Sequence, residues 1–233
     1  MSSPFHDEAT LWAARSPLGE LLALERRWVA SKRIATGNGA RVWIGPASDV
    51  AGTDDGIRLV LGEGDVLSGA MHARLDALPI ADRTVRLLVL QHTLDRRLDP
   101  AVFGECVRVL ATGGELLVFG LNPISPWRPW LAWQARRNRA RPRARMAGRV
   151  GALFGQLGLG TEGLAWIGPS RPGAAGDGDA SSSTGAMFRA AYALTMKKPH
   201  DTVIPLRPRL AERDVGLAVG LVPNATPRMR AGA

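Results

Sequence analysis

The sequence predicts an α/β protein built on a mostly parallel sheet, and residues 85–122 carry the strongest signal. Residues 87–90 are a short apolar run, as expected of a strand that is buried on both faces. In residues 99–110 apolar side chains recur every three or four positions, which is the pattern of one helix face. A second apolar run covers residues 116–119. A strand, a crossover helix and another strand form the basic unit of a parallel sheet.

Residue types mark the boundaries of this predicted helix. Asp99 can cap the first turn, and Pro100 suits the start of a helix. Gly113 and Gly114 then end the helix before the second strand begins. Ligands of parallel sheets bind at the carboxyl ends of the strands, so the residues that follow each strand are the first candidates for a site.

The upstream part of the chain predicts further elements of the same sheet. Residues 18–35 have the apolar spacing of an amphipathic helix, which ends at the glycines around residue 38. Short apolar runs predict strands at 41–44, 57–61 and 73–75. We expect a short helix or a loop at residues 65–70.

The downstream part continues the alternation of helix and strand. A helix is predicted over 145–157, and strands are predicted at 164–167 and 188–196. Residues 173–184 are almost entirely Gly, Ala, Ser and Asp, a composition typical of a mobile loop.

These elements predict one domain with terminal extensions. The expected parts are an N-terminal arm over 1–16, a domain over 17–200 with a basic insert at 134–149 and a flexible loop at 171–185, and a disordered tail over 201–233.

Composition excludes several classes of protein. The 233 residues are 45% apolar but contain no long uncharged apolar run, which indicates a soluble globular chain without a membrane span. The first twelve residues lack the apolar segment of a signal peptide, so we expect a cytoplasmic protein. The single cysteine, Cys106, lies on the apolar stripe of a predicted helix, where a buried structural role is expected.

The net charge of +9 is concentrated in one stretch of the chain. No acidic residue occurs between Glu115 and Glu162, whereas arginine occurs at 128, 136, 137, 139, 141, 143, 145 and 149. Residues 136–149 can contact a polyanion such as RNA, or they can form a solvated loop. No helix-turn-helix, zinc-ligand spacing or RNA-binding strand motif accompanies them, so both interpretations stay open.

The motifs of the central unit also resemble those of a known family. The chain has, in this order, Leu78-Pro79, Asp99-Pro100, Glu105, Arg108-Val109-Leu110 and Gly113-Gly114. This series resembles the second half of a class I S-adenosylmethionine-dependent methyltransferase of the type 11 group, closely over 74–124 and more loosely over 17–200. The resemblance implies a Rossmann-like methyltransferase fold. Its mostly parallel sheet has seven strands, with the last one antiparallel between the fifth and sixth.

The resemblance further implies that the chain is a methyltransferase with S-adenosylmethionine as cofactor, while the methyl acceptor is unknown. The cofactor carries the reactive sulfonium, so the protein supplies binding and orientation. The family has an acid followed by Gly-x-Gly-x-Gly after the first strand, whereas this chain has Gly45, Pro46 and then Gly52. Proline lacks the N–H that a ligand could use. This turn is therefore a degenerate cofactor motif or a purely structural turn.

Other cofactor contacts are implied by position in the family pattern. Glu63, with Asp65 as the alternative, follows the second strand, where an acid would bind the ribose hydroxyls. Asp76, with Ala77 and Leu78, matches the segment that reaches the adenine amine. Solvent-facing or turn-capping acids would look the same in sequence.

The ends of the next two strands supply the remaining candidates. Gln91 and His92 follow the fourth strand, and His92 can orient the acceptor or remove its proton because histidine titrates near neutrality. A structural hydrogen bond is the other interpretation of this histidine. Asn122 and Trp127 are candidate substrate contacts, although Asn122 can make a turn before Pro123 and Trp127 can be packing.

Two functions from different classes follow. The leading hypothesis is an S-adenosylmethionine-dependent methyltransferase. The alternative is a non-catalytic methyltransferase-like protein that binds RNA or another anionic partner through its arginine-rich segment, which the degenerate turn at Gly45 favours. Metal-ligand spacing, a P-loop and a hydrolase nucleophile motif are absent from the sequence.

Overall fold

The computed structural model describes residues 12–13, 15–32, 39–47, 56–62, 65–96, 100–138, 142–174 and 186–200. The sequence predictions for Glu63, for most of the arm over 1–16, for residues 175–185 of the loop and for the tail over 201–233 lie outside these residues.

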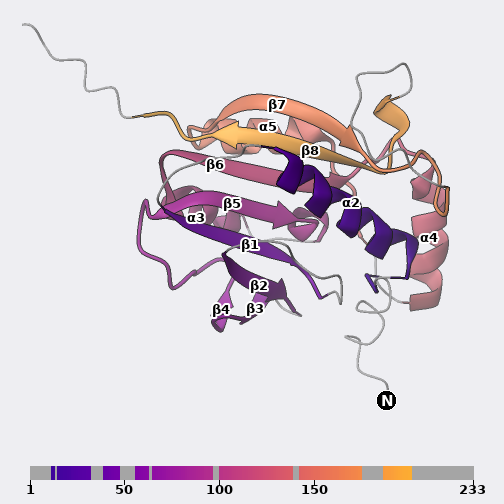
Figure 1. Cartoon of the computed structure of the whole chain (residues 1–233), viewed down its shortest axis with the longest axis horizontal. Coiled ribbons are helices and arrows are strands. Elements are labelled where there is room, and N and C mark those ends of the chain that lie inside the picture. The colour runs from indigo at the N-terminus through magenta and orange to yellow at the C-terminus, as the bar shows by residue number, and fades with distance from the viewer. Residues whose placement is uncertain are drawn as a thin grey trace, which may run out of the picture. The chain divides into compact units, whose positions relative to one another are not determined.

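The described part of the chain alternates helices and strands (Figure 1). In chain order the elements are α2 (Pro17–Ser31), β1 (Ala40–Pro46), β2 (Ile57–Leu61), β3 (Val66–Gly69), β4 (Ala73–Arg74), β5 (Val85–Gln91), η2 (Thr93–Asp95), α3 (Ala101–Val109), β6 (Leu110–Leu121), α4 (Trp127–Asn138), α5 (Ala147–Gln156), β7 (Gly160–Ile167), η3 (Ala186–Phe188) and β8 (Ala191–Lys197).

The strands form one sheet with the order β4-β3-β2-β1-β5-β6-β8-β7. Strands β2, β1, β5 and β6 are parallel to their neighbours in this core. Strand β8 runs antiparallel between β6 and β7. The predicted α/β fold, with a mostly parallel sheet and an antiparallel last strand, is confirmed.

The strand number differs from the prediction, because the described sheet has eight strands instead of seven. Residues 65–70, expected to be a helix or loop, contain β3, which pairs antiparallel with β2. Asp65 has a φ of +61°, which helps the chain reverse within the short connection after β2. Leu67 is fully buried and Val66 is 45% exposed, the alternation of a strand with one buried face.

The inserted β3 displaces β4 outward by one position in the sheet. The sequence predicts residues 73–75 as the third strand, but in the structure β4 is the fourth strand and pairs with β3. One strand spacing is about 4.8 Å. Residues that follow β4 are therefore one strand farther from β1 than they would be if β4 paired with β2 directly.

The first helix begins as predicted and ends earlier. The Ser16 hydroxyl accepts a hydrogen bond from the Gly19 N–H at 2.9 Å, which caps α2 at its start. Lys32 adopts an extended conformation, so the helix ends at Ser31 and not at residue 35.

Two faces of the sheet are packed by different helices (Figure 1). Leu88, Leu116 and their neighbours in the strands pack with the apolar side chains of α3 and α5. Val89, Leu117 and Phe119 point to the opposite face, where α2 contributes Val29. Within the residues described, no helix has the length and apolar character needed to cross a membrane.

Candidate functional site at the carboxyl edge of the sheet

A buried cluster of polar side chains surrounds His92 at the carboxyl end of β5. The His92 Nε2 atom lies 2.9 Å from Oε1 of Glu25 in α2, and its Nδ1 atom lies 2.8 Å from Oδ2 of Asp95 in η2. The same Asp95 oxygen accepts a hydrogen bond from the Leu121 N–H at 2.9 Å. The cluster therefore joins α2, β5, η2 and the end of β6.

Gln91 extends the cluster along β5. Its side-chain nitrogen donates to Oε2 of Glu25 at 2.7 Å, and its side-chain oxygen accepts from the indole N–H of Trp43 at 3.1 Å. Gln91 is fully buried. Both ends of its amide have protein partners, as a buried amide requires.

The backbone at His92 is unusual. Its φ of +52° lies in the left-handed region, which residues other than glycine seldom adopt. This turn directs the chain from β5 into η2 and places the imidazole between the two carboxyl groups. The Trp12 ring stacks beside the imidazole, with ring centroids 4.8 Å apart and an interplanar angle of 33°.

The carboxyl groups decide the protonation of His92. Burial disfavours the charged imidazole, but Glu25 and Asp95 outweigh this effect and raise the pKa of His92 to about 10. Burial also raises the pKa of Asp95 above its ordinary value. At neutral pH both nitrogens of an imidazolium are donors, so His92 has no lone pair with which to accept a proton.

Asp95 retains one unused acceptor. Its Oδ1 atom is buried and has no hydrogen-bond partner. Buried polar atoms of this kind are rare in folded proteins and require an explanation. Here the atom lies in the cluster at the edge where ligands of parallel sheets bind.

Gly45 lies at the end of β1, beside this cluster. A Cβ atom built on Gly45 would lie 3.3 Å from the Cβ of Gln91, which is a tight contact. The close approach of β5 is therefore sufficient to explain a glycine at this position. Pro46 is the last residue of β1, and residues 48–55 of the turn lie outside the described part.

Asp76 follows β4 at the same edge of the sheet, but its carboxylate already has a partner. Both of its oxygens accept hydrogen bonds from the Arg74 guanidinium at 2.8 Å. This pairing lowers the pKa of Asp76. Ala77 is exposed, and the Leu78 N–H donates to Oε1 of Glu105 in α3 at 2.6 Å. The Asp76–Leu78 segment is therefore joined to α3 and displaced outward with β4.

A guanidinium group occupies the carboxyl end of β2. The Arg96 side chain donates to the Gly62 carbonyl at 2.6 Å. Residues 47–56 connect the parallel strands β1 and β2, and this connection is shorter than the dozen or more residues that a crossover helix usually needs.

Asn122 uses its whole side chain within the fold. Its amide nitrogen donates to the carbonyls of Met187 and Arg189 at 2.6 and 3.0 Å, and its amide oxygen accepts from the Ile124 N–H. These bonds hold η3 beside the turn that precedes α4. These hydrogen bonds are those of a turn-forming side chain, and a contact of Asn122 with substrate stays a prediction.

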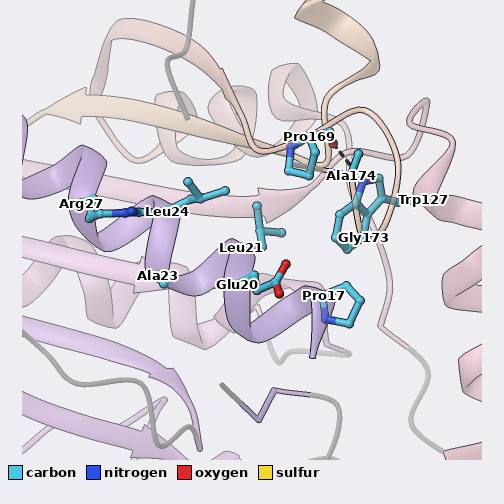
Figure 2. Close-up of a pocket in the computed structure, with 10 residues that line it drawn as sticks. All are labelled: Pro17, Glu20, Leu21, Ala23, Leu24, Arg27, Trp127, Pro169, Gly173 and Ala174. Carbon is cyan, nitrogen blue, oxygen red and sulfur yellow. Dashed lines mark hydrogen bonds between the residues drawn. The ribbon is translucent and has the colours of Figure 1, made fainter. Parts of the chain in front are cut away.

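Trp127 is buried, and its indole N–H donates to the Pro169 carbonyl at 3.0 Å. It also lines a cavity of about 250 Å³ between α2 and the segment after β7 (Figure 2). Glu20, Leu24 and Arg27 of α2 line the same cavity. Gln91 and His92 are not among the residues that line this cavity.

Part of the arginine-rich segment is structural. The Arg145 side chain donates to the carbonyls of Leu94 and Arg96 at 2.9 and 3.0 Å. The Arg143 N–H donates to the Asp95 carbonyl at 2.6 Å. Residues 143–145 therefore hold η2 in place, whereas the Arg128, Arg136 and Arg149 side chains are exposed.

Sequence reasoning missed Glu25 as a member of the site, and it placed Asp95 at the end of the fourth strand without giving it a role. Glu25 follows the buried Leu18, Leu21 and Leu22 at helical spacing, so it is an acid on an otherwise apolar stripe. That position was the available signal, because a carboxylate on a buried face needs a partner. Its partner is 67 positions away and becomes evident only in the fold.

No protein-family model matches the chain, and no curated protein matches it. Solved structures do match. A chain of the Haloferax volcanii complex between the Trm112 methyltransferase activator and a methyltransferase is 16% identical, with a TM-score of 0.53, over 83% of this chain and 97% of that one. An S-adenosylmethionine-dependent methyltransferase of Mesorhizobium loti is 12% identical, with a TM-score of 0.50, over 75% and 99% of the two chains.

A third match extends the range of chemistry found on this fold. The [4+2]-cyclase SpnF is 14% identical, with a TM-score of 0.50, over 76% of this chain and 81% of that one. At these identities the likenesses show the fold alone. The chain therefore has the Rossmann-like methyltransferase fold, and its activity has to be argued from its own residues.

Proposed function

We propose that this chain is an S-adenosylmethionine-dependent methyltransferase of the type 11-like group, with its cofactor site at the carboxyl ends of β1 and β5. One topological observation carries the proposal: β8 runs antiparallel between β6 and β7, beside the parallel core. This is the arrangement that the motifs of residues 74–124 imply. One fold can host many functions, so the residues at the carboxyl edge of the sheet must also suit the cofactor.

The residues at this edge suit a cationic sulfonium compound in two respects. Glu25 and Asp95 supply two carboxyl groups for one imidazole at the end of β5, and the Oδ1 atom of Asp95 has no hydrogen-bond partner. The Trp12 ring lies next to that imidazole, and aromatic faces attract cations. The bound cofactor would supply the reactive methyl group.

In this proposal His92 is a positioning residue and not the base. Its two ring nitrogens hold Glu25 and Asp95, and its raised pKa keeps it protonated at neutral pH. Gln91 fixes the other oxygen of Glu25. The proposed contribution of the protein is therefore binding and orientation, which is what transfer from a sulfonium requires.

A non-catalytic methyltransferase-like protein that binds RNA or another anionic partner is the second candidate. Three features favour this candidate: the short connection over 47–56, the position of Asp76 after a strand that lies beyond β3, and the Arg96 side chain at the end of β2. The family pattern assigns cofactor contacts to the segment after the first strand, to the end of the second strand and to Asp76.

Thermal unfolding with S-adenosylhomocysteine separates the two candidates. A ligand at about 100 times its Kd stabilises the folded protein by about 2.7 kcal/mol, so the proposed site predicts a clear rise in Tm. Adenosine and a short RNA serve as matched ligands. A Tm that is unchanged by millimolar S-adenosylhomocysteine but raised by the RNA would favour the second candidate.

A further inference from the structure

The outer face of α4 carries both basic and apolar side chains. Trp127 and Leu131 of this helix are buried, whereas Arg128, Trp133 and Arg136 are exposed, Trp133 to 49%. Helical spacing places Trp133 and Arg136 on the side opposite the buried pair. Exposed tryptophan and arginine side chains on one face can together contact an anionic membrane surface, because tryptophan favours the headgroup region and arginine the negative charge.

Further apolar side chains are exposed at the start of this helix. Ile124 is 46% exposed, and Met187 and Phe188 of η3 are 50% and 45% exposed. The hydroxyl of Ser125 donates to the Phe188 carbonyl at 3.0 Å, so η3 is fixed beside the turn that leads into α4. We call these four apolar residues, Ile124, Trp133, Met187 and Phe188, together with Arg128 and Arg136, the α4 patch.

The charged residues of α4 and of the turn before it are all basic. This helix and the preceding turn fall within the stretch between Glu115 and Glu162 that contains no acidic residue. Acyl chains and anionic headgroups satisfy an apolar and a basic surface at the same time. Stable peripheral attachment generally needs two such signals together.

We propose that the α4 patch binds the surface of membranes that contain anionic phospholipid. RNA is a less complete match to it. Arginine and tryptophan can bind phosphate and stack on bases, but Ile124 and Met187 would gain nothing from stacking and would gain from entering the acyl region. The helix lies on the surface, with Trp133 at the depth of the headgroups.

Vesicle flotation of the full chain tests this proposal. The probes are vesicles of phosphatidylcholine alone and vesicles of phosphatidylcholine with phosphatidylglycerol, and we expect flotation with the second kind only. The Arg128→Gln/Arg136→Gln variant should bind on the order of 30-fold more weakly, as expected for the loss of two basic groups at an anionic surface. The Ile124→Ser/Trp133→Ser variant should lose at least about tenfold.

Matched controls keep the comparison specific. Arg27→Gln/Arg41→Gln removes the same charge from exposed arginines of α2 and β1. Leu164→Ser removes an apolar side chain of β7 that is 47% exposed. Both controls should bind like the wild type. Because all of these side chains are exposed, thermal unfolding of each variant should match that of the wild type.

A spectroscopic measurement locates the contact. Brominated acyl chains should quench the fluorescence of Trp133, and the Trp133→Phe variant should bind vesicles while losing that quenching. Failure of the wild type to float with anionic vesicles would overturn the proposal. Equal binding by both patch variants and both controls would also overturn it, as would binding of single-stranded RNA that anionic vesicles do not compete away.

Discussion

The Nε2 atom of His92 lies 2.9 Å from the Oε1 atom of Glu25, so the end of β5 is joined to the middle of α2 inside the protein. Both side chains are fully buried. A buried charged pair is favourable only when each member keeps its hydrogen-bonding partners. Here Asp95 and Gln91 supply those partners.

Removing the imidazole should therefore destabilise the fold. In His92→Ala, Glu25 and Asp95 lose their common partner while remaining buried, and the expected loss is about 3–5 kcal/mol of unfolding free energy. Urea denaturation measures this loss. His72→Ala is the matched control because His72 is exposed, and it should stay within about 0.5 kcal/mol of the wild type. Equal stability of the two variants would contradict the prediction that the hydrogen bonds of His92 to Glu25 and Asp95 stabilise the fold.

The stability of the protein should decrease as pH rises from about 6.5 to about 10. The folded-state pKa of His92 is raised to about 10 from the ordinary value of 6.5. Its stabilising contribution is therefore complete below pH 6.5 and is lost as pH rises through 10. Urea denaturation of the wild type and of His92→Asn at several pH values isolates this effect by difference. A difference that stays constant from pH 6 to pH 10 would show that the imidazole is not charged in the folded protein.

Arg145 should contribute to stability, whereas Arg149 should not. The Arg145 guanidinium donates to two carbonyls of the η2 region, and Arg145→Gln leaves them without these partners. A loss of about 1–3 kcal/mol is expected. Arg149→Gln changes the same charge at an exposed position of α5. If both variants unfold at the same urea concentration, the arginine-rich segment does not support η2.

Cys106 should be unreactive in the folded protein. It is fully buried in α3, and burial raises its pKa to about 12. The thiolate that alkylating reagents attack is therefore scarce and inaccessible. Iodoacetamide should modify Cys106 only after urea unfolds the chain. Rapid modification under native conditions would mean that α3 separates readily from the sheet.

Asp76 and Arg74 should behave alike in cofactor binding. Their side chains pair with each other, so neither is expected to reach a ligand at β1 and β5. In calorimetry, Asp76→Ala and Arg74→Gln should each change the affinity for S-adenosylhomocysteine by less than about threefold. A loss of tenfold or more, about 1.4 kcal/mol, in Asp76→Ala alone would place that carboxylate at the adenine.

The sequence predicted the unit from β5 to β6 well, because its signals are local. Helix α3 and the two strands depend on apolar spacing, whereas the prediction that Gly113 and Gly114 end the helix is wrong, because α3 ends at Val109 and both glycines lie within β6. Cys106 is buried as its position on the apolar stripe predicted. Local periodicity of this kind needs no information from distant residues.

Strand β3 was missed because its four residues are too few to show a period. Val66–Gly69 forms a strand through pairing with β2 and through the turn at Asp65, which are not evident from composition. Because β3 was not predicted, the position of β4 and Asp76 beyond it in the sheet was not predicted either. The structure places Asp76 after β4, which is separated from β2 by β3.

The partners of His92 could not be predicted for a different reason. The strand end indicated that His92 would lie at the site, but Glu25 approaches it from a helix that is distant in sequence. Such a pair depends on how α2 crosses the sheet. Charge on an apolar stripe can flag one member of a buried pair, and only the fold identifies the other.

The central claim is that S-adenosylmethionine binds at the carboxyl ends of β1 and β5. Ultraviolet cross-linking of cofactor labelled in its methyl group, followed by peptide mapping, tests this claim most directly. We expect label on the peptides that contain Trp12, Gly45 or His92, and we expect excess S-adenosylhomocysteine to remove it. Absence of competable label on folded protein, or label confined to peptides remote from this edge, would contradict the claim.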